Sequence, residues 1–169
     1  MNNINLMGGV LNKNLDKFFK WFHEPGTPKL IVSEKYVGKN YKVTFRQEKP
    51  MKSGKYSNKV MPITYKIISG KGHFLLQKKT LVLDKKTSSI ELKNQNENPA
   101  VSVFNSFSAP VLVEFKQPID VLFSILEFET DFTSVWMAKK NLDFIFLEKI
   151  ASGQSNLENF ISRTYKILI

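Results

Sequence analysis

Apolar residues near the start of the chain follow a helical period. From Asn14 onward they recur at i, i+3, i+4 and i+7, which places them on one face of a helix that Asn14 caps. The sequence Glu24-Pro25-Gly26-Thr27-Pro28 then ends the helix, because two prolines around a glycine remove backbone donors and favour a corner. The preceding residues, which include Gly8-Gly9, show no period and are predicted to be a lead-in. The apolar helix positions are Leu15, Phe18, Phe19 and Phe22.

From residue 29 to residue 128 the period changes to two. Short segments rich in Val, Ile, Tyr and Phe alternate between apolar and polar positions, which predicts strands. Turn signals separate them at 37–39, in a polar loop at 49–59 that we expect to be mobile, at 70–72 and at 94–98. About seven to nine short strands of this kind are typical of a two-sheet sandwich, and a barrel stays open as an alternative. The expected strands are 29–36, 40–47, 61–68, 73–77, 79–83, 88–92, 101–104, 111–115 and 121–128.

After Asp131 the helical rhythm returns. Asp131 is a candidate cap for a helix that we expect to end near Ser152-Gly153. Residues 156–169 predict a second, amphipathic helix. Its last residues are apolar, whereas natural termini more often end in polar residues, so we expect the chain to be a piece of a longer polypeptide. The apolar positions of the first of these helices are Phe132, Trp136, Leu142, Ile145, Phe146 and Ile150.

Length and composition are those of one domain with a helix or two of extra material. The chain has 169 residues, of which 42% are hydrophobic, enough for a core without disulfides. It has no cysteine, which excludes disulfide scaffolds, zinc fingers and thiol nucleophiles. Its two histidines, His23 and His73, are too far apart for an H-E-x-x-H zinc site. The sequence shows neither a signal peptide nor a membrane span, so we expect a cytoplasmic protein.

A formal net charge of +10 raises the possibility of nucleic-acid binding. All but Arg46 and Arg163 of the 25 basic residues are lysines, and they are scattered along the chain. Because base readout and bidentate phosphate contacts favour arginine, solubilising lysines are the preferred interpretation.

Few side chains suggest a catalytic or ligand-binding role. Glu127, Glu129 and Asp131 alternate as a cation site would, but they directly precede a helix, where negative charge favours a cap. His23-Glu24 is interpreted as a surface pair, and His73 as a structural histidine. Phe107 is expected in the core, as aromatic residues of strands usually are.

Two stretches resemble a known family. The sequence Phe18-Phe19-Lys20-Trp21-Phe22-His23-Glu24-Pro25-Gly26-Thr27-Pro28 resembles the join between the catalytic domain and the small β domain of aminopeptidase N, the alanyl aminopeptidases of the gluzincin class. The stretch Asp131-Phe132-Thr133-Ser134-Val135-Trp136-Met137-Ala138 resembles the entry to that family's C-terminal helical domain, Asp-Phe-(Ser/Thr)-x-x-Trp-x-Ala. Ser108-Ala109-Pro110-Val111 also precedes a strand as in that family. The resemblance covers about residues 15–142.

The resemblance implies a mainly β chain, an immunoglobulin-like antiparallel β-sandwich with a short N-terminal helix and one or two C-terminal helices. It divides the chain into a lead-in and join (1–28), the sandwich (29–130) and the start of a helical domain (131–169). The family's zinc site and catalytic residues have no counterpart here, so we expect no catalytic residue, metal ligand or cofactor in this chain, and zinc in the catalytic domain of the parent. The residues expected to anchor the sandwich to its neighbours are Trp21, Phe22, Gly26, Thr27, Pro28, Asp131, Phe132 and Trp136.

The expected function is inferred from the longer aminopeptidase of which this chain would be a part. We expect a noncatalytic spacer between the catalytic domain and the C-terminal helical domain of a zinc aminopeptidase that removes N-terminal amino acids from peptides. Those two domains are the expected partners, with no membrane contact. A stand-alone protein-binding sandwich is the first alternative, and lysine-based nucleic-acid binding is disfavoured.

Overall fold

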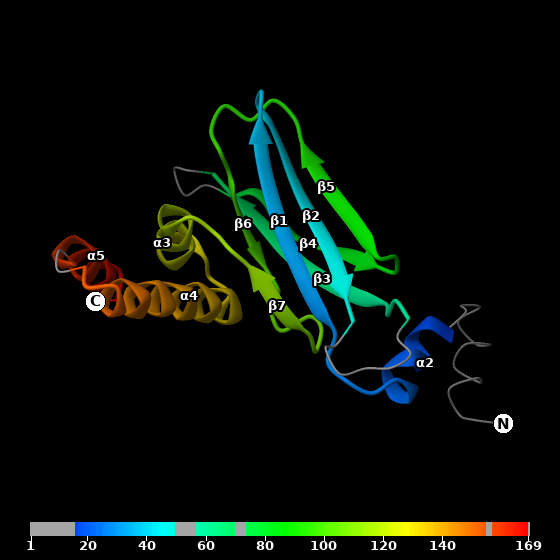
Figure 1. Cartoon of the computed structure of the whole chain (residues 1–169). Helices are drawn as coiled ribbons and strands as arrows, with labels where there is room; N and C mark the ends of the chain where they lie inside the picture. Colours follow the sequence, from blue (N-terminus) through cyan, green and yellow to red (C-terminus); the bar gives the residue numbers. More distant parts are fainter. Residues whose placement is uncertain (1–15, 50–56, 70–73, 155–156, 169) are drawn as a thin grey trace.

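The computed structural model describes residues 16–49, 57–69, 74–154 and 157–168, which form two β-sheets with helices at both ends (Figure 1). The predicted lead-in, the Asn14 cap, the turn at 70–72, His73, Ile169 and most of the loop at 49–59 lie outside the described residues. The elements are α2 (Asp16–His23), β1 (Lys29–Val37), β2 (Asn40–Glu48), β3 (Met61–Ile68), β4 (Phe74–Leu83), β5 (Thr87–Leu92), β6 (Ala100–Val103), β7 (Leu112–Phe115), α3 (Ile119–Phe128), α4 (Phe132–Ala151) and α5 (Glu158–Leu168).

The strands form a four-stranded sheet in the order β5-β2-β1-β7 and a three-stranded sheet in the order β4-β3-β6. Four of the five strand pairings are antiparallel, whereas β7 runs parallel to β1. β7 pairs only with Lys29–Val32, the first half of β1. The predicted mainly β sandwich is therefore confirmed, with one parallel pair.

The hairpin between β1 and β2 follows from its turn residues. Gly38 and Lys39 both have positive φ, 55° and 66°. Of the two-residue turns that match the right-handed twist of a hairpin, the type I′ turn requires positive φ at both positions. The full register from Lys29 opposite Glu48 to Val37 opposite Asn40 confirms the predicted hairpin.

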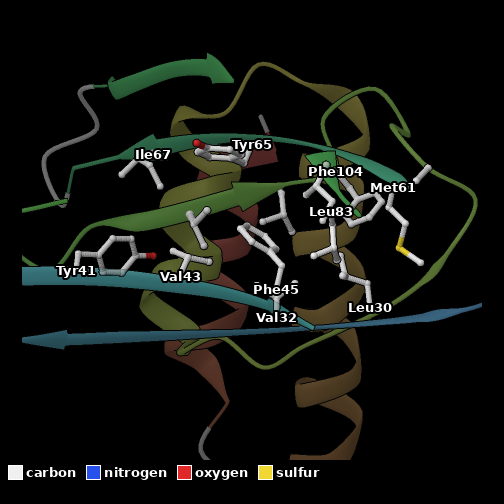
Figure 2. Close-up of a cluster of buried hydrophobic side chains, with 14 residues drawn as sticks. Leu30, Val32, Tyr41, Val43, Phe45, Met61, Tyr65, Ile67, Leu83 and Phe104 are labelled. Atoms are coloured by element: carbon white, nitrogen blue, oxygen red, sulfur yellow. The ribbon is translucent and has the colours of Figure 1, made fainter. Parts of the chain in front are cut away.

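The main core lies between the two sheets (Figure 2). Along β2, Tyr41, Val43 and Phe45 point inward and are at most 1% exposed, as the alternation predicts. From β3, Met61 and Ile63 meet them from the other sheet. This face-to-face packing of alternate residues supplies most of the apolar burial of the sandwich.

The three-stranded sheet is buried on both faces along the second half of β3 and along β6. Along β3, Lys66 and Ile68 are buried as well as Tyr65 and Ile67, which point to the opposite side. A second apolar cluster lies between α3 and α4, and Phe160 of α5 packs against it. The buried members of this cluster are Leu122, Phe123, Ile125, Leu126, Ala138 and Leu142.

The prediction of a strand at 121–128 is wrong, because this segment is helix α3. Its buried residues Leu122, Phe123, Ile125 and Leu126 have the spacing i, i+1, i+3 and i+4 of one helix face. Pro118 stands directly before the helix and Asp120 lies in its first turn, which are both helix-start signals. The segment is apolar at almost every position, so its period alone did not separate a strand from a helix.

The two strands predicted at 73–77 and 79–83 are one strand, β4. Its register with β3 shifts between Tyr65, which pairs with Lys79, and Ile67, which pairs with Leu76. One extra residue of β4 is therefore accommodated at a β-bulge, where the alternation is interrupted but the strand continues. The predicted helices after Asp131 and 156 are confirmed as α4 and α5.

We expect Phe45→Ala to lower the free energy of unfolding by about 3–5 kcal/mol, because it leaves a cavity at the centre of the main core. Urea denaturation measures this change. Val82→Ala is the matched control: Val82 is 55% exposed on β4, so its truncation should change the free energy by no more than about 0.5 kcal/mol. Equal effects of both substitutions would contradict the described core.

Candidate functional site

The predicted anchor residues lie at two places where helices meet the sandwich. We call residues 21–28, from the last turn of α2 to the start of β1, the N-terminal join. We call residues 129–136, from the end of α3 into the first turns of α4, the C-terminal join. Figure 1 shows α2 at one end of the long strands and α4 beside the sheets, away from α2. The structure therefore brings the predicted residues together in two separate groups.

Lys59 is the centre of the N-terminal join. Its side chain is fully buried. Its ammonium donates to the carbonyl oxygen of Lys20 at 2.6 Å and approaches the Glu24 carboxylate at 3.3 Å and carbonyl oxygen at 3.4 Å. It also lies 5.5 Å from the centre of the Trp21 ring. The last carbonyls of a helix lack partners within the helix and attract cations, so Lys59 stabilises the end of α2 against the sandwich.

Gln47 fixes the position of Lys59. Its side-chain oxygen accepts from the backbone N–H of Lys59 at 2.9 Å, and its amide donates to the carbonyls of Lys59 at 3.1 Å and Lys85 at 2.7 Å. Gln47 is only 1% exposed, so these bonds are made away from water, where an unsatisfied amide would be unfavourable. The buried lysine is therefore held by the sheet itself.

Trp21 and Glu24 complete the N-terminal join. The Trp21 indole N–H donates to the carbonyl oxygen of Val60 at 2.9 Å, and the ring packs against the main core. The Ser57 hydroxyl donates to the carboxylate of Glu24. That hydrogen bond is the largest influence on the pKa of Glu24, and together with Lys59 it outweighs desolvation and holds the pKa below its usual range. Both residues thus connect α2 to the segment that leads into β3.

The other predicted residues of this join differ in exposure. Gly26 adopts φ of 96°, a conformation that favours glycine. Pro28 is buried, and its carbonyl oxygen accepts from the backbone N–H of Leu112 at 3.0 Å. Thr27 and Phe22 are exposed, Phe22 to 67%. Phe22 therefore contributes no core packing to the described sandwich.

Glu129 is the centre of the C-terminal join. Its side chain is fully buried and forms an ion pair with the ammonium of Lys66. The same carboxylate oxygen accepts from the backbone N–H groups of Thr130 at 2.7 Å and Asp131 at 2.9 Å. Desolvation raises the pKa of Glu129, but hydrogen bonds from Lys66, Ser102 and these backbone groups outweigh it and hold the pKa below its usual range.

Asp131 caps α4 and binds a loop of the sandwich. Its carboxylate accepts from the backbone N–H of Ser134 at 3.2 Å, which confirms the predicted cap. It also accepts from the backbone N–H and the hydroxyl of Ser106, both at 3.1 Å. Asn105 donates to the Ser134 hydroxyl at 2.6 Å. The preference for a cap over a cation site is therefore supported: Asp131 caps, and Glu129 pairs with Lys66.

The loop at 104–107 presents one aromatic ring inward and one outward. Phe104, Ser106 and Phe107 have φ of 64°, 59° and 51°, a region in which bulky residues are rare. Phe104 is 2% exposed, whereas Phe107 is 70% exposed. The prediction that Phe107 belongs to the core is wrong, because the left-handed backbone turns its side chain away from the sandwich.

Phe107 borders an apolar groove between β7 and α4. The groove encloses about 280 Å³. Leu112 is 61% exposed and Trp136 48% exposed at this site. Lys140 also lines it, with its ammonium 5.4 Å from the centre of the Trp136 ring. Phe132, at the start of α4, is 81% exposed. Two of the predicted anchors, Phe132 and Trp136, therefore present apolar surface to the solvent.

Sequence reasoning missed the polar residues that hold both joins, chiefly Lys59, Lys66 and Asn105. A signal existed for Lys66, which stands between Tyr65 and Ile67 in a segment that is apolar at most positions. A lysine in such surroundings needs a carboxylate or carbonyl partner when it is buried. Lys59 gave no such signal because it lies in a polar segment, and Asn105 gave none because asparagine is an ordinary turn residue at the end of a strand.

The described residues show neither a metal cluster nor a membrane segment. No group of three or more His, Cys, Asp or Glu side chains within them lies close enough together to hold a metal ion. None of their helices is long and apolar enough to cross a bilayer.

We expect Lys59→Met to release α2, because it removes the cation that binds the carbonyls of Lys20 and Glu24. Hydrogen–deuterium exchange of the α2 amides should accelerate by at least about tenfold, while exchange in β2 changes less. Lys35→Met, at an exposed position of β1, is the matched control and should leave α2 unchanged. Unaltered exchange in α2 of the Lys59 variant would contradict this role.

We expect Glu129→Gln to lower the free energy of unfolding at pH 7 by about 3 kcal/mol, because it leaves the Lys66 ammonium buried without its carboxylate. Since the folded-state pKa of Glu129 is depressed, its contribution is present above the unfolded pKa of about 4.3 and is lost as the pH falls through the folded pKa. Urea denaturation between pH 7 and pH 2 should therefore show that the free energy of unfolding falls less with acid in this variant than in the original chain. Glu127→Gln, an exposed neighbour, should retain the full pH dependence, and identical curves for both would refute the assignment.

Comparison with known proteins agrees with the resemblance to aminopeptidase N. Aminopeptidase N of Haemophilus influenzae is 24% identical over an aligned length of 150, and the match covers 82% of this chain and 17% of that protein. The crystal structure of Legionella pneumophila aminopeptidase A in complex with aspartic acid matches with a TM-score of 0.72 and 23% identity, covering 85% of this chain and 17% of that one. The chain thus spans about a sixth of the length of these relatives and resembles one segment of each.

A family model described as a domain of unknown function (DUF3458) with an Ig-like fold matches residues 26–116, more than half of the chain. This range begins at the glycine of the N-terminal join and includes all seven strands. The sandwich described above and this match agree on the fold, and the chain belongs to the DUF3458 Ig-like family.

Proposed function

We propose that this chain is a noncatalytic spacer in a zinc-dependent aminopeptidase of the aminopeptidase N type, which removes N-terminal amino acids from peptides in the cytoplasm. The observation that carries the proposal is the match of 82% of the chain to 17% of an aminopeptidase N. In this proposal the catalytic domain precedes the N-terminal join, and a C-terminal helical domain continues from α4.

The polar contacts at the two joins support a spacer role. Lys59 binds the end of α2, and Glu129 with Asp131 binds the start of α4, through side chains that the sandwich holds in place. A rigid sandwich fixes the distance and angle between two attached domains, which a flexible linker does not do. The exposed aromatic residues Phe22, Phe132 and Trp136 supply apolar surface for those domains.

Zinc belongs to the catalytic domain in this proposal. The donor set of the described residues does not fit a zinc site, because they bring no three His, Cys, Asp or Glu side chains together. We assign peptide binding and hydrolysis to the rest of the longer protein, and positioning to this chain, because the chain matches only 17% of the aminopeptidase N.

We expect the 169-residue chain to show no turnover of alanine p-nitroanilide with added zinc, and the longer protein encoded by the surrounding reading frame to hydrolyse it. Chelation should abolish that activity. In the longer protein, Lys59→Met should lower kcat/KM by about threefold or more if the join positions the catalytic domain, whereas the control Lys35→Met should not. Zinc-dependent turnover by this chain alone, or an inactive longer protein, would refute the proposal.

A further inference from the structure

The second half of β1 has an open edge. β7 pairs with Lys29–Val32 and no further, so the edge of β1 from Ser33 to Val37 has no partner strand among the described residues. Figure 1 shows β1 continuing past the end of β7, where the chain turns away into α3. An unpaired edge presents backbone N–H and C=O groups that a further strand can bind. The fold therefore leaves the side of β1 accessible to a short extended segment.

The backbone groups of Glu34 and Tyr36 face this edge. The carbonyl oxygen of Pro28, directly before β1, accepts from the backbone N–H of Leu112 at 3.0 Å, so the even-numbered positions here point their backbone groups toward β7. In an antiparallel pair such as β1 with β2, alternate residues bond to the partner strand and those between them point away from it. The same alternation continues to Glu34 and Tyr36, which lie beyond the last pairing of β7.

A groove of about 470 Å³ lies beside the open edge, between β1, the end of β7, Asn98 and Pro118. This volume is within the range of about 300–1,000 Å³ that is usual for ligand pockets. The loop between β5 and β6 is held at one end of the groove. The Tyr36 hydroxyl donates to the carbonyl oxygen of Gln95 at 2.8 Å, and the backbone N–H of Gln95 donates to the carbonyl oxygen of Lys39 at 2.8 Å. The groove is therefore formed before an occupant binds.

The Glu34 carboxylate lines this groove without a counter-ion. It accepts from the Tyr41 hydroxyl at 2.6 Å, and no basic side chain of the described residues forms an ion pair with it. Burial raises the pKa of Glu34, and the hydrogen bond from Tyr41 offsets this only in part. The other charges of the groove interact with one another, because Lys29 and, to a smaller extent, Lys116 lower the pKa of Glu114. A half-buried carboxylate with one neutral donor is stabilised by a nearby cation, so Glu34 favours a basic group in the occupant.

A second copy of this chain does not fit the edge. Two copies related by a two-fold axis would pair their β1 edges antiparallel, with each contact made reciprocally. The register that uses the free backbone groups of both Glu34 and Tyr36 pairs these two residues and sets Lys35 directly opposite Lys35. Like charges directly opposite each other destabilise a strand pair, and an exposed lysine on an edge strand is a usual guard against self-pairing. The occupant is therefore a different chain segment.

We infer that the open edge of β1, Ser33–Val37, is a docking site for an extended peptide segment that carries a basic side chain beside Glu34. The segment adds a strand to the four-stranded sheet. Its backbone bonds to Glu34 and Tyr36, and alternate side chains enter the groove. None of these residues belongs to either join, so docking at this edge is independent of the proposed function.

The test is an NMR titration of the ¹⁵N-labelled full chain with the acetylated and amidated peptide TVTKTVT. This sequence reads the same in both directions, so parallel and antiparallel docking both place its lysine beside Glu34 with a valine two positions away on each side. We expect the amide resonances of residues 33–37 to shift, while those of β5, the opposite edge of the same sheet, stay unchanged. Binding at β5 instead, or no binding at about 1 mM peptide, would overturn the inference. Shifts that depend on protein concentration without peptide would assign the edge to a second copy and would also overturn it.

Backbone pairing is tested with two methylated versions of the peptide, each carrying N-methyl groups on one of the two alternating sets of amides. Only every second N–H of a strand faces its partner. One version should therefore bind weaker by about tenfold or more, and the other by less than about threefold. Equal binding of the two versions would contradict strand addition.

Recognition of the basic side chain is tested with a double-mutant cycle. Glu34→Gln keeps an acceptor for the Tyr41 hydroxyl but removes the charge. It should weaken binding of TVTKTVT by about tenfold or more and change binding of TVTQTVT by less than about threefold. Glu127→Gln, at an exposed position of α3 outside the groove, is the matched control and should change neither. If Glu34→Gln affected both peptides equally, the carboxylate would not select a basic side chain and the inference would fail.

Discussion

The buried ammonium of Lys66 constrains how the helices can pack on the sandwich. It lies on a sheet face where its neighbours are apolar, and a buried cation without an acceptor is strongly unfavourable. Glu129 supplies the acceptor, and the same carboxylate oxygen binds the next two backbone N–H groups. The chain direction after α3 is thereby fixed. Asp131 then caps α4 while it binds Ser106, so the direction of α4 follows from one buried charge.

A buried lysine also holds the helix at the other end of the molecule. Lys59 precedes β3 and binds the last carbonyl groups of α2, and Lys66 lies within β3. The two lysines are seven positions apart along the chain, which corresponds to a distance on the order of 20 Å for extended chain. One stretch of chain, which leads into β3 and runs along it, therefore carries the cations that hold both joins. The Lys59 side chain is fully buried and that of Lys66 only 11% exposed, so both have little freedom to move independently of the sandwich.

Sequence patterns correctly predicted the elements that have one face against the core and the other in water. β2 alternates cleanly between apolar and polar residues, because one face contacts the core and the other contacts water. The helix cap at Asp131 and the turn at Gly38 could also be predicted, because each depends on the residue type at that position. The prediction failed at 121–128, where both faces are apolar and the period carries little information. Phe107 was misplaced because its orientation depends on the bonds of the loop to Asp131, which no local pattern records.

The candidate joins were located by motif, but the interactions that hold them were not. Trp21 and Asp131 could be identified from their neighbours in the sequence. Their partners Val60, Ser106 and Lys59 are distant along the chain and became visible only through the pairing of the sheets. Long-range polar contacts of this kind depend on topology, and the topology rests on the register of strands rather than on any one residue.

The parallel pairing of β7 with the first half of β1 has a mechanical consequence. The chain enters the sheet at Lys29, beside Leu112, and leaves it at Phe115, beside Val32. Tension applied through the two ends of the sandwich would pull β1 and β7 in opposite directions along their length. The hydrogen bonds between them would then be loaded together in shear, rather than opened one after another. The sandwich is thus built to transmit force from one end to the other without extending.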